Sequence, residues 1–303
     1  MNRLANRASA RRRAAGEHAA TVVITAAGWF AVAVLLGILA VLVVNSFDAF
    51  SSIGLLSWIQ DDRWSPDPYR AGEGRYGIFA MLAGTGYVTL GAMVLAVPIG
   101  IGAGAYLAEF ATPWVREVVK PAIELLAAIP SVVVGFLGIV LVGPILADLL
   151  GTANPLNAAN GAVLLAIMSL PTIVSITEDA ISAVPSHQRN GSYALGAGRF
   201  ETLWRVVLPG ARSGIVAAVM LGLGRAVGET MTVLMATGNA LAFPEGLTAS
   251  VRTLTATIAI EMGEVPRGTV HYSALFVLGL VLFLITLLVN WVADRILARS
   301  EPR

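Results

Sequence analysis

Long apolar stretches separated by short polar segments dominate the pattern of the chain. Five stretches without a charged residue exceed the ~18 residues that a helix needs to cross a bilayer: Val22 to Val44, Leu82 to Ala108, Leu125 to Ala147, Leu149 to Thr177 and Tyr272 to Ala293. A sixth, Ser213 to Pro244, is interrupted only by Arg225 and Glu229. The pattern predicts an all-α, polytopic membrane bundle with six transmembrane helices, at about 22–46, 80–108, 122–148, 160–183, 211–241 and 272–294.

The composition agrees with a membrane protein and excludes several kinds of enzyme. Of the 303 residues, 56% are hydrophobic and 13% are charged, whereas soluble domains carry roughly 25% charged residues. The chain has no cysteine and three widely separated histidines, so no thiolate site or zinc enzyme is expected. Its only lysine, Lys120, precedes a proline, so the phosphate-binding loop ending in Gly-Lys-Ser/Thr is missing. Another chain must therefore handle any ATP, and we predict no cofactor, catalytic residue or nucleic acid partner.

The distribution of basic residues predicts the orientation of the chain. Cytoplasmic loops of membrane proteins carry an excess of lysine and arginine, and the arginine-rich start therefore places residues 1–21 in the cytoplasm. Six spans then return residues 295–303 to the same side and make residues 47–77 an external loop. On this topology most of the 20 basic residues lie inside, and few lie outside: Arg63, Arg70, Arg75, Arg252 and Arg267.

The external loop 47–77 mixes acidic residues, such as Asp61 and Asp62, with Trp58 and Trp64. Aromatic residues anchor connectors at a membrane interface, and exposed loops also carry binding surfaces. Both interpretations stay open: a solvated connector, or a docking surface for an external partner.

The loop 184–209 carries the most informative pattern. Its sequence, VPSHQRNGSYALGAGRFETLWRVVLP, predicts two short helices, Gln188–Leu195 and Arg199–Val207, with a turn at Gly196–Gly198 between them. Neither helix is long enough to span a membrane. Together they combine basic residues with an apolar face that suits a cytoplasmic partner. That face consists of Tyr193, Leu195, Phe200, Leu203, Trp204 and Val207.

At this loop the chain resembles the membrane subunits of binding-protein-dependent ABC importers. Their cytoplasmic signature is Glu-Ala-Ala, three residues, Gly, nine residues, Ile, any residue and Leu-Pro. The Gly and the ending match with the same spacing, whereas Asn-Gly-Ser replaces Glu-Ala-Ala. The resemblance implies a type I permease core at 78–294 whose loop docks onto an ATPase subunit. The residues expected to couple to the ATPase are Asn190, Gly191, Ser192, Gly196, Arg205, Val206, Leu208 and Pro209.

Arg225 and Glu229 are the two charges inside the predicted fifth span. Four residues apart on one helix, they would share a face about 6 Å apart and could pair. Charges near the centre of a membrane are costly and generally functional. Two interpretations stay open: a self-neutralised pair that locks helix packing, or a polar station for an anionic substrate, since a guanidinium suits an oxyanion. The hydroxyls of Ser131 and Thr230 are further candidates for the path.

Three segments resemble phosphate importer permeases, of the PstC type more than the PstA type and CysTW-like in subfamily: Ile123–Gly138, Gly222–Ala240 and Trp64–Phe79. The resemblance implies transport of inorganic phosphate across the bacterial cytoplasmic (inner) membrane, in contact with lipid. It also implies a PstA-type permease, two PstB-type ATPases and a periplasmic PstS-type phosphate-binding protein as partners. The alternatives are a permease for another oxyanion, such as sulfate or molybdate, and a proton-coupled secondary transporter.

Finer packing features are also predicted. Glycines within the spans indicate close helix approach, and prolines within them indicate bends. We expect Lys120 to pair with Glu124 one turn later, and Glu178 and Asp179 to be solvated at a helix end. The glycines are Gly100, Gly102, Gly104, Gly222, Gly224 and Gly228, and the prolines are Pro98, Pro130, Pro144 and Pro171.

Overall fold

The structure is a computed structural model that describes residues 2–54, 57–61, 63–66 and 74–300. The side chains of the arginine-rich start, and residues 301–303 of the predicted C-terminal segment, lie outside the described part. So does most of the Trp64–Phe79 segment before Gly74.

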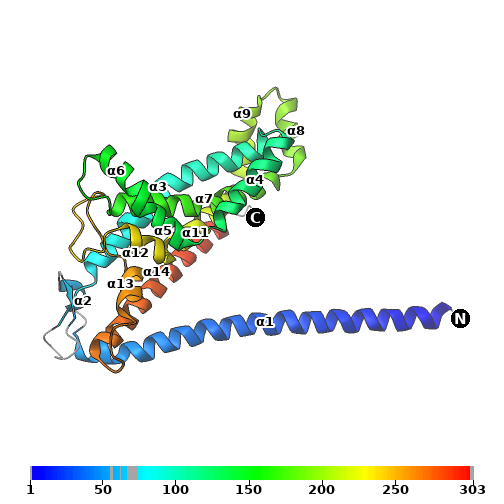
Figure 1. Cartoon of the computed structure of the whole chain (residues 1–303). Helices are drawn as coiled ribbons and strands as arrows, with labels where there is room; N and C mark the ends of the chain where they lie inside the picture. Colours follow the sequence, from blue (N-terminus) through cyan, green and yellow to red (C-terminus); the bar gives the residue numbers. More distant parts are fainter. Residues whose placement is uncertain (1, 55–56, 62, 67–73, 301–303) are drawn as a thin grey trace.

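The described chain is a bundle of helices with one hairpin of two short strands, each two residues long (Figure 1). The loop of short helices lies at one end of the bundle and the hairpin at the other, and we call these the loop end and the hairpin end. The elements are α1 (Asn2–Ser52), α2 (Ser57–Gln60), β1 (Trp64–Ser65), β2 (Arg75–Tyr76), α3 (Phe79–Glu109), α4 (Pro113–Ala127), α5 (Ser131–Leu137), η1 (Gly138–Val142), α6 (Gly143–Leu150), α7 (Ala158–Ser182), α8 (Ser186–Ala194), α9 (Arg199–Thr202), η2 (Leu203–Val207), α10 (Leu208–Gly210), α11 (Arg212–Gly228), α12 (Met231–Ala236), α13 (Leu254–Glu261) and α14 (Val270–Ser300).

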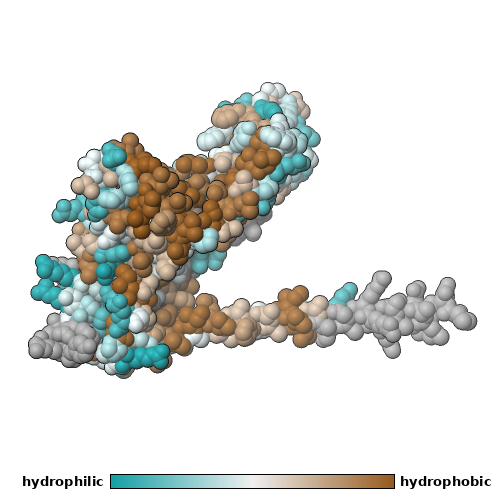
Figure 2. Space-filling model, viewed as in Figure 1, coloured by the Kyte–Doolittle hydropathy of each residue, from teal (hydrophilic) through white to brown (hydrophobic). Residues whose placement is uncertain are grey.

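Five helical segments of the described chain are long and apolar enough to cross a membrane. The helical segments Arg199–Gly210 and Arg212–Gly228 meet at a 72° bend. They form a sixth span if they are counted together. Figure 2 shows brown apolar surface between the polar, teal ends of the bundle. The prediction of a polytopic helical membrane protein is confirmed. The five segments are Ala20–Ser52, Phe79–Glu109, Ser131–Leu150, Ala158–Ser182 and Val270–Ile296.

Two of the predicted spans have different boundaries in the structure. The range 122–148 was expected to be one helix, but Pro130 separates α4 from α5, so the third candidate span begins at Ser131. The range 211–241 was also expected to be one helix, but it is interrupted between α11 and α12. Hydropathy alone does not detect these interruptions, because the residues on both sides of each one are apolar.

Prolines reshape the helices in two ways. Pro130 adopts an extended conformation and precedes the first residue of α5. The two five-residue π-helical stretches, η1 and η2, each end one residue before a helix that has proline at its second position, Pro144 and Pro209. A proline has no N–H and its ring clashes with the carbonyl four residues earlier, and a wider π turn accommodates both effects. Helices α3 and α7 continue through Pro98 and Pro171.

The hairpin end is held together by polar contacts around Glu261 of α13. Its carboxylate accepts a hydrogen bond from Trp64 Nε1 at 2.9 Å and forms an ion pair with Arg252 at 3.0 Å. His271 Nε2, in the first turn of α14, lies 2.8 Å from the same carboxylate. Trp64 and His271 are both buried. The contacts therefore connect β1, the segment before α13, and α14. The chain of α1 packs against α14 near its Ser52 end and then diverges from the bundle (Figure 1).

Close approach of α3 and α7 organises the centre of the bundle. A Cβ atom added at Gly100 would lie 2.6 Å from Ile173 Cγ2, and one added at Gly104 would lie 2.9 Å from Thr177 Cβ. Gly222 of α11 approaches Ile173 in the same way, at 2.7 Å. The expectation of close approach is confirmed for these three glycines. Gly102, Gly224 and Gly228 make no such approach within the described chain, since nothing lies within 4 Å of an atom added there.

We predict that Gly104→Ala lowers the free energy of unfolding of the detergent-purified chain by about 1–3 kcal/mol, because overpacking forces neighbouring groups apart. The backbone oxygen of Val174, 3.0 Å from the added atom, cannot rotate away. Gly102→Ala, on the same helix with open space beside it, is the matched control and should leave stability unchanged or slightly raised. Equal unfolding midpoints in denaturant for the two variants would contradict this account of the contact.

Candidate functional site

The interruption of the fifth span lies at Glu229 and Thr230. Glu229 has extended backbone angles (φ −67°, ψ 132°), so α11 ends at Gly228 and α12 starts at Met231. The backbone groups at the break find partners nearby: the hydroxyl of Thr255 donates to the carbonyl of Glu229 at 2.9 Å. The Glu229 carboxylate accepts a hydrogen bond from the backbone N–H of Thr232 at 3.3 Å. These contacts pair two of the backbone groups that are freed where a helix stops within an apolar bundle.

The start of α5 lies beside this break. The hydroxyl of Thr232, in α12, donates to the carbonyl of Ser131, the first residue of α5, at 3.1 Å. Buried Asn160 of α7 donates through Nδ2 to the carbonyls of Gly138 and Ala236, at 3.0 and 3.2 Å. The structure therefore places the broken third and fifth spans side by side. Among the predicted path residues, it brings Ser131, Glu229 and Thr230 into one neighbourhood, in which Thr230 Oγ1 donates to the carbonyl of Gly228 at 3.3 Å.

Arg225, in the last turn of α11, is half-buried. Within the part of the chain that the structure describes, its guanidinium makes no hydrogen bond and no ion pair. The pairing with Glu229, one of the two interpretations that the sequence left open, is not formed, because the helix ends before Glu229 and the carboxylate accepts a hydrogen bond from the N–H of Thr232 instead. The interpretation as a self-neutralised packing pair no longer applies to this chain.

The chemistry of the Arg225 side chain suits an anion. A guanidinium presents parallel N–H donors that match the oxygen atoms of an oxyanion. An apolar bundle makes an unpaired cation costly, and such a residue is generally functional. The carboxylate of Glu229 lies near the site but is engaged with the start of α12, so it leaves the donors of Arg225 available.

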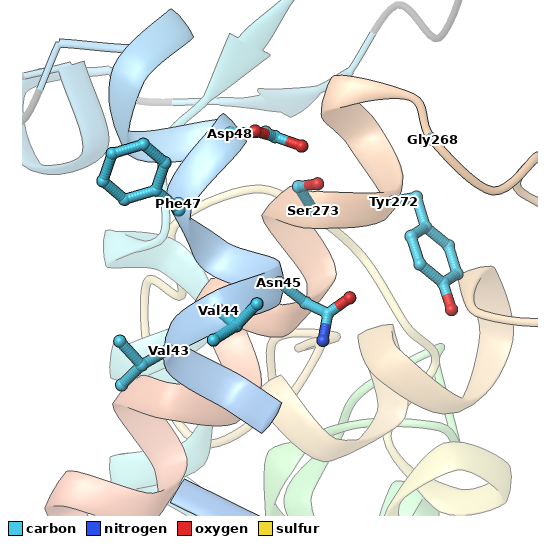
Figure 3. A pocket seen from close by; sticks show the side chains of 8 residues that line it. All are labelled: Val43, Val44, Asn45, Phe47, Asp48, Gly268, Tyr272 and Ser273. Atoms are coloured by element: carbon cyan, nitrogen blue, oxygen red, sulfur yellow. The ribbon is translucent and has the colours of Figure 1, made fainter. Parts of the chain in front are cut away.

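A hollow of about 510 Å³ lies elsewhere, between the end of α1 and the start of α14 (Figure 3). Asn45 and Asp48 of α1 line it together with Tyr272 and Ser273 of α14. None of its lining residues belongs to α11 or α12, so this hollow is separate from the Arg225 site.

The 184–209 loop contains the predicted turn at Gly196. The N–H of Gly196 donates to the carbonyl of Tyr193 at 3.0 Å, and the N–H of Ala197 donates to that of Ser192 at 3.2 Å. These two bonds form a Schellman motif, which requires a left-handed residue after the helix end. Gly196 supplies it with φ +87°. The hydroxyls of Ser192 and Thr202 are 2.9 Å apart and join the two arms of the loop.

The predicted apolar face of the loop divides into two sets. Leu203 and Val207 are buried against the bundle, whereas Leu195, Phe200 and Trp204 are exposed, Leu195 to 91%. A hollow of about 300 Å³ on the loop is lined by four of the predicted coupling residues, Ser192, Gly196, Arg205 and Val206. Asn190 and Gly191 lie exposed on α8, Leu208 is half-buried and Pro209 lies exposed before the 72° bend.

The sequence analysis missed the residue that holds the loop to the bundle. Glu109, the last residue of α3, forms an ion pair with Arg189 at 2.8 Å, and its carbonyl accepts a hydrogen bond from Arg199 at 2.9 Å. Arg189 also donates to the carbonyls of Ile181 and Val184, at 2.7 and 2.6 Å. A lone acidic residue closing an apolar stretch, on the side that carries the basic loop, was the signal in the sequence.

The roles expected for Lys120 and Glu178 are also wrong. Lys120 contacts Glu178 and Asp179 rather than Glu124, and Glu178 is fully buried rather than solvated. Both errors have one cause: α4 lies along the end of α7, and a contact between two helices does not follow from spacing within either of them.

Comparisons with known proteins identify the family and the fold of this chain. Residues 96–303 match the family described as binding-protein-dependent transport system inner membrane component. Solved structures support the fold: a MetNI methionine ABC transporter chain matches with a TM-score of 0.55 at 20% identity, over 75% of this chain and 95% of that one. A chain of a bacterial ABC transporter for alginate import matches with a TM-score of 0.54 at 15% identity, over 84% and 88%. The chain therefore belongs to the family of binding-protein-dependent transport system inner membrane components.

Curated relatives point to one branch of this family. The chain is 34% identical over 297 residues to the phosphate transport system permease protein PstC of Pasteurella multocida. The match covers 91% of this chain and 90% of that protein. The chain is 36% identical over 299 residues to PstC of Mesorhizobium japonicum, over 92% and 89%. The probable ABC transporter permease protein YqgH of Bacillus subtilis is 34% identical over 280 residues, over 90% of each chain. The predicted resemblance to the PstC type is confirmed.

We predict that Gly196→Val opens the turn of the 184–209 loop, because a β-branched residue is strained in the left-handed region by about 1–2 kcal/mol. Amides of Gly196 and Ala197, which carry the Schellman bonds, should then exchange hydrogen about 5- to 30-fold faster in the purified protein. Gly198→Ala is the matched control, since Gly198 has φ −75° and open space around it. Similar exchange in both variants would rule out the conformational role of Gly196.

Proposed function

We propose that this chain is the permease subunit of an ATP-driven importer and moves inorganic phosphate through the path beside Arg225. The single observation that carries the proposal is the half-buried guanidinium without an internal partner, at a break in a membrane span of a PstC-like chain. An oxyanion supplies the partner that the chain itself does not. Thr230 and Ser131 lie next to the break and would line the same passage.

In the proposed assembly this chain pairs with a PstA-type permease and binds two PstB-type ATPase subunits. A periplasmic PstS-type protein delivers phosphate. The membrane is the bacterial inner membrane, with both termini of the chain in the cytoplasm. The hairpin end then faces the periplasm and the loop end faces the ATPases. The relatives named as phosphate transport system permease proteins support this cargo, and the family description, a binding-protein-dependent transport system, supports a binding protein as a partner.

The 184–209 loop, called the coupling loop from here on, would transmit the work of the ATPase. Its exposed residues Leu195, Phe200 and Trp204 form an apolar surface for a groove on that subunit. The ion pair of Arg189 with Glu109 and the hydroxyl contact of Ser192 with Thr202 keep the loop from deforming when it is pushed. Movement of the loop would therefore tilt the spans attached to it.

We predict that Arg225→Gln reduces phosphate uptake at limiting phosphate by about 10- to 150-fold, since a hydrogen bond to a charged group contributes ~1.5–3 kcal/mol. Uptake is measured in proteoliposomes that contain the complete complex with ATP inside. Arg212→Gln, at the exposed start of the same helix, is the matched control and should transport normally. Undiminished uptake by Arg225→Gln would remove Arg225 from the path.

The same vesicles test the cargo and the energy source. Phosphate uptake should require the ATPase subunit and continue when the proton gradient is dissipated, and sulfate should not be accumulated. Uptake that follows the proton gradient would indicate secondary transport, and preferential accumulation of sulfate would indicate another oxyanion permease. Either result contradicts the proposal.

A further inference from the structure

A fully buried carboxylate links α7 to α4 near the loop end. The side chain of Glu178, on α7, has 0% exposure, and its two oxygens contact different cations, Arg116 and Lys120. Arg116 also donates to the hydroxyl of Ser182 at 3.2 Å, and Lys120 donates to Asp179 at 2.9 Å. The hydrogen bond from Lys120 to Glu178 raises the pKa of Lys120, and the bond to Asp179 makes a smaller contribution. Lys120 is therefore charged at neutral pH.

Glu178 stands directly before the coupling loop. Helix α7 ends at Ser182, and only three residues separate it from α8. Arg189 of α8 folds back onto α7 and the residue after its C-cap, through the carbonyls of Ile181 and Val184. A displacement of α8 is therefore expected to move the end of α7, where Ser182 lies in the last turn and Glu178 lies one turn earlier.

Helix α4, which carries Arg116 and Lys120, connects this contact to the neighbourhood of Arg225. Arg116 and Lys120 are one turn apart on α4, and only three residues separate the end of α4 at Ala127 from the start of α5 at Ser131. The first residue of α5, Ser131, accepts the hydrogen bond from Thr232 beside Glu229. The contact between α4 and α7 thus joins the coupling loop to the broken spans.

Apolar packing does not explain this contact. None of the residues of α4 is buried, and every hydrogen bond and ion pair between α4 and α7 in the described chain comes from Arg116 or Lys120. A buried ion pair is a poor way to gain stability, since apolar replacements are often equally stable. A buried ion pair instead provides geometric specificity. A carboxylate held by two cations fixes the position of one helix relative to the other, whereas apolar surfaces can slide past each other.

We propose that Glu178 is a positioning residue for transport: held by Arg116 and Lys120, it transmits movement of the coupling loop to the Arg225 site. This inference rests on the proposed function of the chain as an ABC permease. It assigns Glu178 no contact with the cargo or with ATP.

The test compares Glu178→Gln with Asp179→Asn in the complete complex. Both variants remove one carboxylate charge near Lys120, but Asp179 is 68% exposed and Glu178 is buried. Phosphate uptake and ATP hydrolysis are measured on the same vesicles. Glu178→Gln should transport about 2- to 30-fold less phosphate per ATP, the range typical of altered coupling between sites, with hydrolysis within about twofold of the unmodified complex. Asp179→Asn should match the unmodified complex.

A second measurement does not depend on the cargo. The chain has no cysteine, so Val132→Cys, at an exposed position of α5, supplies its only thiol. The rate of maleimide labelling of this thiol is read without phosphate, in the nucleotide-free and the ATP-trapped complex. The rate should change on trapping, and Glu178→Gln should abolish that change. Since no phosphate is present, this result stands even if the cargo proves to be another anion.

Three results would overturn the proposal. In the first, Glu178→Gln keeps both the transport per ATP and the nucleotide-dependent labelling. In the second, uptake and hydrolysis fall in proportion, as expected for a merely structural role. In the third, labelling is independent of nucleotide in the unmodified complex. If Glu178→Gln fails to assemble, Lys120→Met carries the same expectation, because Lys120 is 29% exposed and its stem tolerates an apolar replacement.

Discussion

A helix that stops inside an apolar bundle must find partners for its free backbone groups, and this constraint shapes the centre of the molecule. The fifth span stops at Gly228, and Thr255 and the carboxylate of Glu229 supply partners for the freed groups. Asn160 does the same for the carbonyls of Gly138 and Ala236. Neutral groups and one carboxylate make these contacts, and none of them involves the guanidinium of Arg225.

The buried and half-buried charges of the described chain differ in how they are compensated. Glu109, Glu178 and Glu261 each have a basic partner, and each connects two elements of the bundle. Arg225 has none within the described residues. Charges that serve the fold are expected to be paired, because an uncompensated charge in low dielectric is costly. This contrast is the reason for proposing that Arg225, unlike the three paired carboxylates, meets a ligand.

Fold and function rest on different evidence. Transporters for methionine and alginate share the fold at 20% and 15% identity, so the arrangement of spans does not define a cargo. The phosphate assignment rests instead on the PstC relatives, which are 34–36% identical to this chain over about 90% of its length. The proposed role of the coupling loop does not depend on the cargo: its turn, its exposed apolar residues and its contacts to Glu109 are separate from the Arg225 site.

The sequence by itself determined that the chain is a polytopic helical membrane protein and that a turn lies at Gly196, and it singled out Arg225 as a charge within an apolar stretch. Hydropathy, turn residues and the cost of an intramembrane charge can be read locally. Only the tertiary structure decided that Arg225 and Glu229 do not pair, since the end of α11 at Gly228 depends on partners from other helices. It also decided that Glu178 is buried between two cations, and that Leu195 and Trp204 are exposed whereas Leu203 is buried. Which face of a helix meets a neighbour is set by packing across the bundle, and no pattern within one helix contains that information.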